Sequence, residues 1–415
     1  MIDLAEARRL LLAACHRLEP VPLNSAEADG CVLAADVVAP GNVPPFDNSS
    51  VDGYAVRAAD VAGATASSPV RLDVLGSVLA GSVADRPVGP GQAWKVMTGA
   101  PVPGGADAVV MVEKTSATRT EQLGAAGDRV EVLSEVAPGA GIRRAGSDVP
   151  AGELVLAAGT VLRPAHLGVL ASVGAWQVSG YRRLRVGVLV TGDELVTGGG
   201  ELRPGQIYES NRAMLLALLA RANCEPVDLG VAGDDVAVLQ DRLSAALDSC
   251  DAVLTSGGVS MGDSDPVRAV LDRFGGLSWL QVAIRPAKPF AFGVLAGPAG
   301  PVPVLGLPGN PVSALVSFEL LARPALRHMM GHPDPYPGTV LGLADAPLHR
   351  PHGDGRTAYL RVLCQFGPDG RLHVRPVAGQ DSHQLSASAA AGGLAVVEDG
   401  RRVQAGDEVP VHLLS

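Results

Sequence analysis

The sequence contains few aromatic residues and few charged ones, and both shortages limit its possible partners. Aromatic residues make up 3% of the 415 residues, so widespread recognition by stacking on rings, as single-stranded nucleic acids need, is not expected. The formal net charge of −10 opposes attraction to nucleic acid and to acidic membranes. We therefore expect neither nucleic acid nor a membrane as a partner.

Cysteines are also scarce, and none forms a Cys-x-x-Cys pair. Neither a disulfide framework nor a zinc cluster is indicated, and a reducing cytoplasm fits best. The first residues carry acids rather than a basic segment before an apolar run, which does not indicate a secretion signal. The stretch 289–318 has no charged residue, but its prolines and glycines would interrupt a membrane-spanning helix.

What is abundant is aliphatic sequence, in a pattern that changes along the chain. Hydrophobic residues make up 47%, and the length predicts several domains. Residues 3–18 have helical spacing. From Val51 to about Gly174 short apolar runs are split by glycine, proline and aspartate, which predicts a small β-module, with a helix at 164–173. Its strands are predicted at 54–56, 108–112, 130–133 and 154–156.

From Leu184 onward buried-strand runs alternate with helical segments, which predicts a parallel α/β sheet. The strands are predicted at 185–191, 226–229, 251–255, 280–284, 289–294 and 302–305. The helices are predicted from Ser210, from a cap at Asp234 through Ser249, after Asp265–Pro266, and from Asn310 to about Met330 with a kink at Pro324. After residue 331 strands return, with a hairpin around Gly367–Gly370, which predicts a small C-terminal β-barrel or sandwich.

Glycine-rich loops follow three of the predicted strands. They are Thr191–Glu194, Ser256–Ser260 and Gly306–Pro311. Ligands of open parallel sheets bind outside the carboxyl ends of the strands, where backbone N–H groups are free, so we expect an anionic small molecule there. None of the loops is a Walker A or a dinucleotide-binding motif, and a glycine loop can also be only a tight turn.

Charged residues near these loops suggest further chemistry. Glu194, Asp234 and Asp265 follow successive strands and could meet at a magnesium ion that bridges to a phosphate, although Asp234 and Asp265 could instead cap helices. Arg285 and Lys288 lie three residues apart in a proline-bracketed turn, which suits an oxyanion. A solvated basic pair is the alternative.

An ordered series of motifs then points to one family. The motifs are Asn48–Val56, Met97–Pro101, Thr191–Glu194, Ser256–Ser260, Lys288–Phe290 and Leu307–Pro311. Together they span nearly the whole chain, and the sequence resembles the molybdopterin molybdenumtransferases, which include the E domain of gephyrin.

The resemblance implies a multidomain α/β plus β fold in four parts. These are a discontinuous linker domain (1–45 and 140–180), an inserted β-module (46–139), a central parallel α/β molybdopterin-binding domain (181–330) and a C-terminal β-barrel (331–415). It also implies a cytoplasmic homodimer that takes adenylylated molybdopterin and molybdate, cleaves the phosphoanhydride with Mg²⁺ and releases AMP. A non-catalytic molybdopterin-binding scaffold or carrier, or a molybdopterin adenylyltransferase, are the alternatives.

The resemblance also assigns residues to the site. The catalytic positions would be Asp52, Thr98 and Asp148 of one subunit with Glu194, Asp234 and Asp265 of the other. Magnesium would be held by Asp234 and Asp265 with Glu194, and Glu194 and Asp52 would position the attacking oxygen. The pterin loops would contribute Thr191, Gly192, Asp193, Ser256, Gly257, Gly258, Ser260, Pro308, Gly309 and Asn310. The oxyanion pocket would consist of Arg285, Lys288, Ser313, Arg361 and Ser382. Family members usually carry lysine at the position of Arg285 and can carry it at that of Gln281, so the charge is kept at the first and lost at the second.

Overall fold

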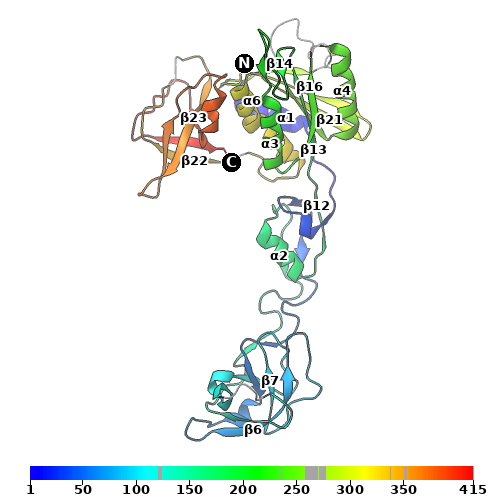
Figure 1. The fold of residues 1–415 in the computed structure, drawn as a ribbon, viewed down its shortest axis with the longest axis vertical. Coiled ribbons are helices and arrows are strands. Elements are labelled where there is room, and N and C mark those ends of the chain that lie inside the picture. The colour runs from blue at the N-terminus through cyan, green and yellow to red at the C-terminus, as the bar shows by residue number, and fades with distance from the viewer. Residues whose placement is uncertain are drawn as a thin grey trace.

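The chain folds into an elongated molecule with a broad head, a narrow neck and a separate module at the far end (Figure 1). The structure is a computed structural model that describes residues 1–119, 124–233, 235–257, 270, 277–336, 338–349 and 353–414. Both chain ends lie in the head, where an α/β domain and a β-barrel sit side by side. No helix within those ranges is long and apolar enough to cross a membrane.

The α/β domain is built on a sheet of six strands within the described residues. Their order is β16 (Glu225–Ala232), β13 (Arg185–Thr191), β17 (Ala252–Ser256), β21 (Gly300–Leu307), β20 (Pro289–Gly297) and β18 (Ser278–Gln281). The first four are parallel, as predicted, while β20 and β18 are antiparallel to their neighbours. Only Pro298 and Ala299 separate β20 from β21, a connection too short for a parallel crossover.

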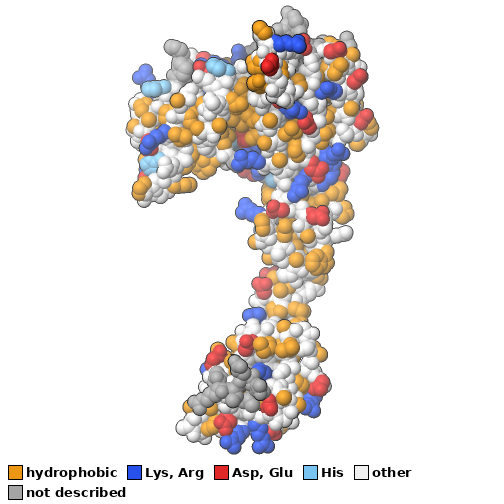
Figure 2. Space-filling view, in the orientation of Figure 1, with side chains coloured by type: hydrophobic (Ala, Val, Ile, Leu, Met, Phe, Trp, Pro, Cys, Tyr) orange, Lys and Arg blue, Asp and Glu red, His pale blue; other side chains and the backbone are white. Residues whose placement is uncertain are grey.

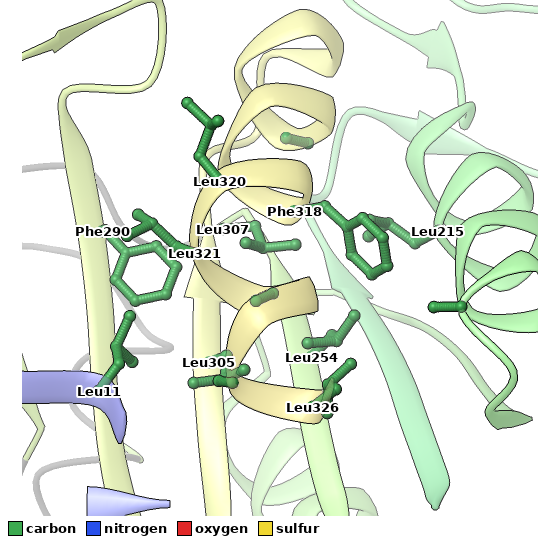
Figure 3. Packing of buried hydrophobic residues seen from close by; sticks show 14 of the residues in the cluster. Leu11, Leu215, Leu254, Phe290, Leu305, Leu307, Phe318, Leu320, Leu321 and Leu326 are labelled. Atoms are coloured by element: carbon green, nitrogen blue, oxygen red, sulfur yellow. The ribbon is translucent and has the colours of Figure 1, made fainter. Parts of the chain in front are cut away.

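A helical layer closes the core over one face of this sheet. The helices here are α3 (Asn211–Arg221), α6 (Pro311–Ser317), the π-helical turn η5 (Phe318–Ala322) and α7 (Arg323–Met329). Figure 3 shows Phe318, Leu321 and Leu326 packed among side chains of the strands and of α3. The π turn ends at Ala322, two residues before Pro324, the position at which a kink was predicted, and proline has no N–H to donate to the preceding turn.

Two helices differ from the sequence-based expectations, one in its first residue and the other in the domain that it packs against. Helix α4 (Val236–Ser249) is capped by Asp235, whose carboxylate accepts hydrogen bonds from the amides of Ala237 and Val238. The cap predicted at Asp234 is therefore one residue early, and Asp234 lies outside the described residues. The second difference is α1 (Leu4–Ala14), which the predicted boundaries placed with the linker. Its Ala7 and Leu11 are instead buried in the core of the α/β domain.

The neck is formed by residues from both sides of the distal module. Strand β12 (Gln177–Tyr181) pairs with β1 (Val21–Asn24) and β2 (Val32–Leu33), and helix α2 (Pro164–Ser172) packs nearby. Two shorter pairs continue toward the module: β3 (Val37–Val38) with β11 (Leu154–Leu156), and β4 (Asn48–Ser49) with β10 (Ile142–Arg143). The module is therefore an insertion in a discontinuous linker, as the resemblance implied.

The distal module is a β-domain with its own apolar cores. Within the described residues its sheet has the order β8 (Ala108–Met111), β5 (Gly53–Val56), β7 (Gln92–Val96), β6 (Val70–Val78) and β9 (Arg129–Val132). Short helical turns lie at 58–61, 112–114 and 116–119. Figure 2 shows basic and acidic side chains interspersed over the visible face of this module and of the head.

The C-terminal part closes into a barrel, one of the two alternatives predicted. Its strands are β22 (Thr339–Ala344), β23 (Thr357–Phe366), β24 (Leu372–Pro376), β25 (Gly393–Val397) and β26 (Glu408–Leu413). Pairing of β23 with both β24 and β25 completes the ring, and the hairpin predicted around Gly367–Gly370 joins β23 to β24. A short strand of the α/β domain, β19 (Ile284–Arg285), pairs with the start of β23 and connects the two domains.

Candidate functional site

The described parts of the three predicted ligand loops meet at the carboxyl edge of the sheet. In the register of the parallel strands, Ser256 at the end of β17 lies between Val190 of β13 and Leu307 of β21. Gly257 has a φ of +92°, and a Cβ there would lie 2.5 Å from the carbonyl oxygen of Thr191. Glycine is therefore needed for the loop after β17 to approach β13 this closely. Gly258 and Ser260 lie outside the described residues.

Two carboxylates gather at the end of β13. Gly192 has a φ of +150°, and the carboxylate of Glu194 lies close to it. A Cβ at position 192 would be 2.6 Å from Glu194 Oε2. The carboxylate of Asp193 lies close to Gly233, at the end of β16, where a Cβ would meet Oδ1 at 2.7 Å. Within the described residues no group of three or more acidic, histidine or cysteine side chains could hold a metal ion. Asp234 and Asp265 are outside those residues, so the predicted magnesium set stays a prediction.

Ser256 was predicted to contact the pterin, but its side chain is directed into the protein. It is fully buried, and its hydroxyl accepts a hydrogen bond from Asn211 Nδ2 at 2.9 Å and donates to Pro308 O at 3.4 Å. The same Nδ2 of Asn211 donates to Gly309 O at 2.7 Å. Sequence reasoning missed Asn211. The available signal was a polar amide at the first position of a helix that begins at the carboxyl edge of the sheet.

The predicted oxyanion residues surround a pocket of about 440 Å³ between the α/β domain and the barrel. Four of them line it: Arg285, Lys288, Ser313 and Ser382. Sequence reasoning missed three further basic side chains in the lining, His349, Arg356 and His383, and it also missed the acid Asp381. His349 and Arg356 precede β23 in a segment rich in basic residues, and His383 adjoins Ser382, so position next to motif residues was the available signal.

A tight turn brings the two predicted cations together. Between Arg285 and Lys288 the chain passes through Ala287, which has a φ of +78°, an uncommon value for a residue with a side chain. The turn is closed by a hydrogen bond of 2.8 Å from Val282 N to Lys288 O. Arg285 also forms an ion pair of 3.6 Å with Asp354, whose carboxylate accepts hydrogen bonds from Arg356. Asp354 therefore holds two arginines of the pocket in place, and the lining has more basic side chains than acidic ones, with Asp381 as its acid.

Arg361, the fifth predicted oxyanion residue, does not line the pocket. Its side chain is 1% exposed and donates hydrogen bonds to the carbonyl oxygens of Gly379, Asp381 and Gln384 and to the hydroxyl of Ser388. Burial lowers the pKa of this guanidinium. Arg361 therefore holds the loop that presents Ser382, and its hydrogen-bond donors are directed into the protein rather than toward an anion.

The pocket and the predicted pterin loops share one chain segment. Asn310 Nδ2 donates to Ser382 Oγ at 3.1 Å, and Val312 N donates to Ser382 O at 3.1 Å. The same segment contains Gly309, which Asn211 holds, and Ser313, which lines the oxyanion pocket. Residues 307–313 are therefore a wall common to both parts of the site.

The remaining predicted residues lie elsewhere. Thr98 donates to Asp52 Oδ1 from its backbone N–H at 2.7 Å and from its hydroxyl at 2.8 Å, and these bonds lower the pKa of Asp52. Both residues are exposed on the distal module, and Asp148 is exposed beside the neck. Figure 1 shows that the distal module is far from the α/β domain of the same chain. One subunit alone therefore does not bring these residues to Glu194.

Comparison with known proteins covers nearly the whole chain. Residues 2–174 match a family described as the MoeA N-terminal region (domain I and II), residues 187–328 match a probable molybdopterin binding domain, and residues 344–414 match the MoeA C-terminal region (domain IV). The order of these regions agrees with the order of neck and distal module, α/β domain and barrel.

Individual relatives show the same extent of similarity. The molybdopterin molybdenumtransferase 2 of Mycobacterium tuberculosis is 39% identical, over 99% of both chains, and the molybdopterin molybdenumtransferase of Haemophilus influenzae is 39% identical over 94% of both. A crystal structure of the molybdopterin biosynthesis MoeA protein from Pyrococcus horikoshii OT3 aligns with a TM-score of 0.76 at 31% identity, over 100% of both chains. The chain therefore belongs to the molybdopterin molybdenumtransferase family.

Proposed function

We propose that this protein inserts molybdenum from molybdate into adenylylated molybdopterin and releases AMP in a Mg²⁺-dependent reaction. Its relatives place it among the transferases of molybdenum cofactor biosynthesis. The observation that supports the finer assignment is the wall formed by residues 307–313. It adjoins a cationic pocket on one side and the glycine loops of the sheet on the other.

The pocket has the chemistry that a compact dianion requires. Arg285, Lys288 and Arg356 supply positive charge, and the hydroxyls of Ser313 and Ser382 can donate to oxyanion oxygens. The buried guanidinium of Arg361 donates to the carbonyl oxygens of Gly379 and Asp381 and so holds the loop that carries Ser382. Molybdate would therefore be held between the α/β domain and the barrel, with the pterin phosphates on the glycine loops next to it.

The carboxylates at the end of β13 fit a magnesium site by their chemistry. Mg²⁺ prefers oxygen ligands and binds through one or two carboxylates together with substrate phosphates; Glu194 presents such oxygens beside the loops, next to Asp193, and Asp234 and Asp265 remain the other proposed ligands. When bound, the ion would neutralise the pyrophosphate and polarise its phosphorus for attack. We assign Glu194 a role in orienting the attacking oxygen, from water or molybdate. The P–O bond of the anhydride then breaks, and AMP leaves.

We further propose that the working form is a homodimer with a shared cleft. The Asp52–Thr98 pair is exposed and lies far from the α/β domain of its own chain. In a dimer the pair could lie beside Glu194 of the second subunit. We also place the reaction in the cytoplasm. All five cysteines are free thiols, as expected in a reducing compartment.

The test follows AMP release by purified protein that is supplied with adenylylated molybdopterin and Mg²⁺. We expect release to depend on molybdate and to leave molybdenum bound to molybdopterin. Glu194→Gln should reduce release by about 100-fold or more, because it removes a carboxylate from the reacting region. Glu201→Gln, an exposed acid in the loop between the short strands β14 (Leu195–Val196) and β15 (Ile207–Tyr208), is the matched control. AMP release that ignores molybdate, or no release, would refute the proposal.

A further inference from the structure

Asn211 occupies a position between the loops of the α/β domain. It is the first residue of α3, which begins at the carboxyl edge of the sheet, and it is 6% exposed. Its side-chain NH₂ group has two hydrogens, and both have acceptors: Ser256 Oγ at 2.9 Å and Gly309 O at 2.7 Å. The amide therefore connects three elements at one point, namely the start of α3, the end of β17 and the loop after β21.

The other end of the same amide is left without a partner. Asn211 Oδ1 is buried and accepts no hydrogen bond within the described structure. A buried polar atom without a partner costs stability, and in native proteins it requires an explanation. An alanine here would avoid the unpaired oxygen, but it would lose both donated bonds. The two donated bonds supply the explanation, since they fix the backbone at Gly309 relative to Ser256.

What Asn211 fixes is the wall shared by the two parts of the site. Gly309 lies between Pro308, whose carbonyl accepts from Ser256, and Asn310, which holds Ser382 of the barrel. Ser313, four residues after Gly309, lines the oxyanion pocket. A shift of the Gly309 carbonyl would therefore change the distance between the glycine loops and the pocket.

We propose that Asn211 is a positioning residue of the transferase site: its amide holds residues 307–313 against the end of β17, and so sets the distance between the pterin phosphates and the bound oxyanion. This inference rests on the proposed function. Asn211 is 6% exposed and both hydrogens of its Nδ2 are donated to protein atoms, so we assign it a positioning role and not a catalytic one.

The first experiment needs no substrate. Hydrogen exchange is measured in full-length wild type and in Asn211→Ala, Asn211→Asp and Ser256→Ala. Peptides covering residues 305–314 should exchange at least about tenfold faster in Asn211→Ala, while those of β13 stay unchanged. Asn211→Asp keeps the shape but places a carboxylate oxygen against Gly309 O, so it should have the same effect. Ser256→Ala keeps the hydrogen bond from Asn211 to Gly309, so it should speed the exchange of these peptides less. Thr255→Val removes a neighbouring buried hydroxyl that has no hydrogen bond, and it is the control.

The second experiment measures AMP release. We expect Asn211→Ala to lower kcat and to raise the KM for molybdate, each by about tenfold, at a temperature where the variant is fully folded. If Asn211 had only a structural role, its substitution would lower the melting temperature and leave kcat and the KM for molybdate of the folded enzyme unchanged. Faster exchange throughout the sheet, or unchanged kinetics with a loosened 305–314 segment, would overturn the proposal. If wild type released no AMP, the proposed function would fail, while the exchange result would still decide whether Asn211 holds the segment.

Discussion

At the scale of single residues, Arg361 and Arg285 show two ways in which an arginine can serve one pocket. Arg285 lines the cavity and is partly exposed, with an ion pair to Asp354. Arg361 is buried and directs its donors to four acceptors of the protein. In the proposed function the first supplies charge to the oxyanion, whereas the hydrogen bonds of the second hold the loop around Ser382 in shape.

These roles predict different outcomes for the two substitutions. Arg361→Met should lower the free energy of unfolding by about 3 kcal/mol, because it removes four part-buried hydrogen bonds of one side chain, and it should also weaken molybdate binding. Arg285→Gln should weaken molybdate binding with little change in stability, because a partly exposed ion pair contributes little. Urea unfolding and equilibrium binding of molybdate measure both effects. Equal losses of stability in the two variants would contradict the distinction.

The same residues mark the limit of prediction from sequence. Motif matching found Lys288, Ser313 and Ser382, which the structure does bring to one pocket. It also assigned ligand contacts to Ser256 and Arg361, whose hydrogen bonds go to protein atoms instead. A motif specifies a residue type at a position. Which way its donors point depends on carbonyls that are more than ten residues away along the chain, and no local pattern contains that information.

At the scale of elements, the barrel strands β22, β23 and β24 are joined by a charged clamp around His373. Its Nδ1 lies 2.6 Å from Asp345 Oδ1, and its Nε2 lies 3.1 Å from Asp369 Oδ1. Hydrogen bonding to Asp345 and then to Asp369 raises the pKa of His373 above its ordinary 6.5. The pKa of Asp345 is lowered by His373 and Arg375, and that of Asp369 by the Arg371 amide and then by His373.

The clamp predicts how the stability of the barrel depends on pH. The contribution of His373 to the free energy of unfolding is fully present below pH 6.5 and is lost as the pH rises through its raised pKa. The contributions of Asp345 and Asp369 are lost as the pH falls below 3.8, the ordinary pKa of aspartate, toward their lowered pKa values. His373→Gln should therefore destabilise the protein more at about pH 5.5 than at about pH 9. Urea unfolding at the two pH values measures this, with the exposed His16→Gln as control. An equal loss at both pH values would contradict the clamp.

The elements also differ in how far their sequence determined them. Continuous apolar runs predicted the buried strands at 185–191 and 251–255 to within a residue. The same kind of run did not give the direction of β20, because periodicity reports burial and not orientation. The two-residue connection to β21 sets that direction. The placement of α1 in the α/β core could not be predicted either, because its apolar stripe fits any apolar surface and only the tertiary fold supplies one.

At the scale of the whole molecule, the elongated shape separates residues that the family resemblance assigns to one reaction. The distal module with Asp52 and Thr98 lies at one end, and the α/β domain with Glu194 lies at the other (Figure 1). The neck between them consists of short strand pairs from residues 21–49 and 142–181. If these residues do act in one reaction, a second subunit must bring them together, and mixing subunits tests this proposal.

Subunit complementation is the decisive measurement. Asp52→Asn and Glu194→Gln should each lower AMP release by about 100-fold or more as homodimers. In a heterodimer of the two variants, one site receives Asp52 from one subunit and Glu194 from the other and is intact, while the second site lacks both. Random association of equal amounts would make half of the dimers mixed, so co-expression should restore about one quarter of wild-type activity. Differently tagged subunits allow the mixed dimer to be isolated, where about half of the activity per dimer is expected. If each site were built within a single chain, every site in the mixture would carry one lesion, and no activity would return.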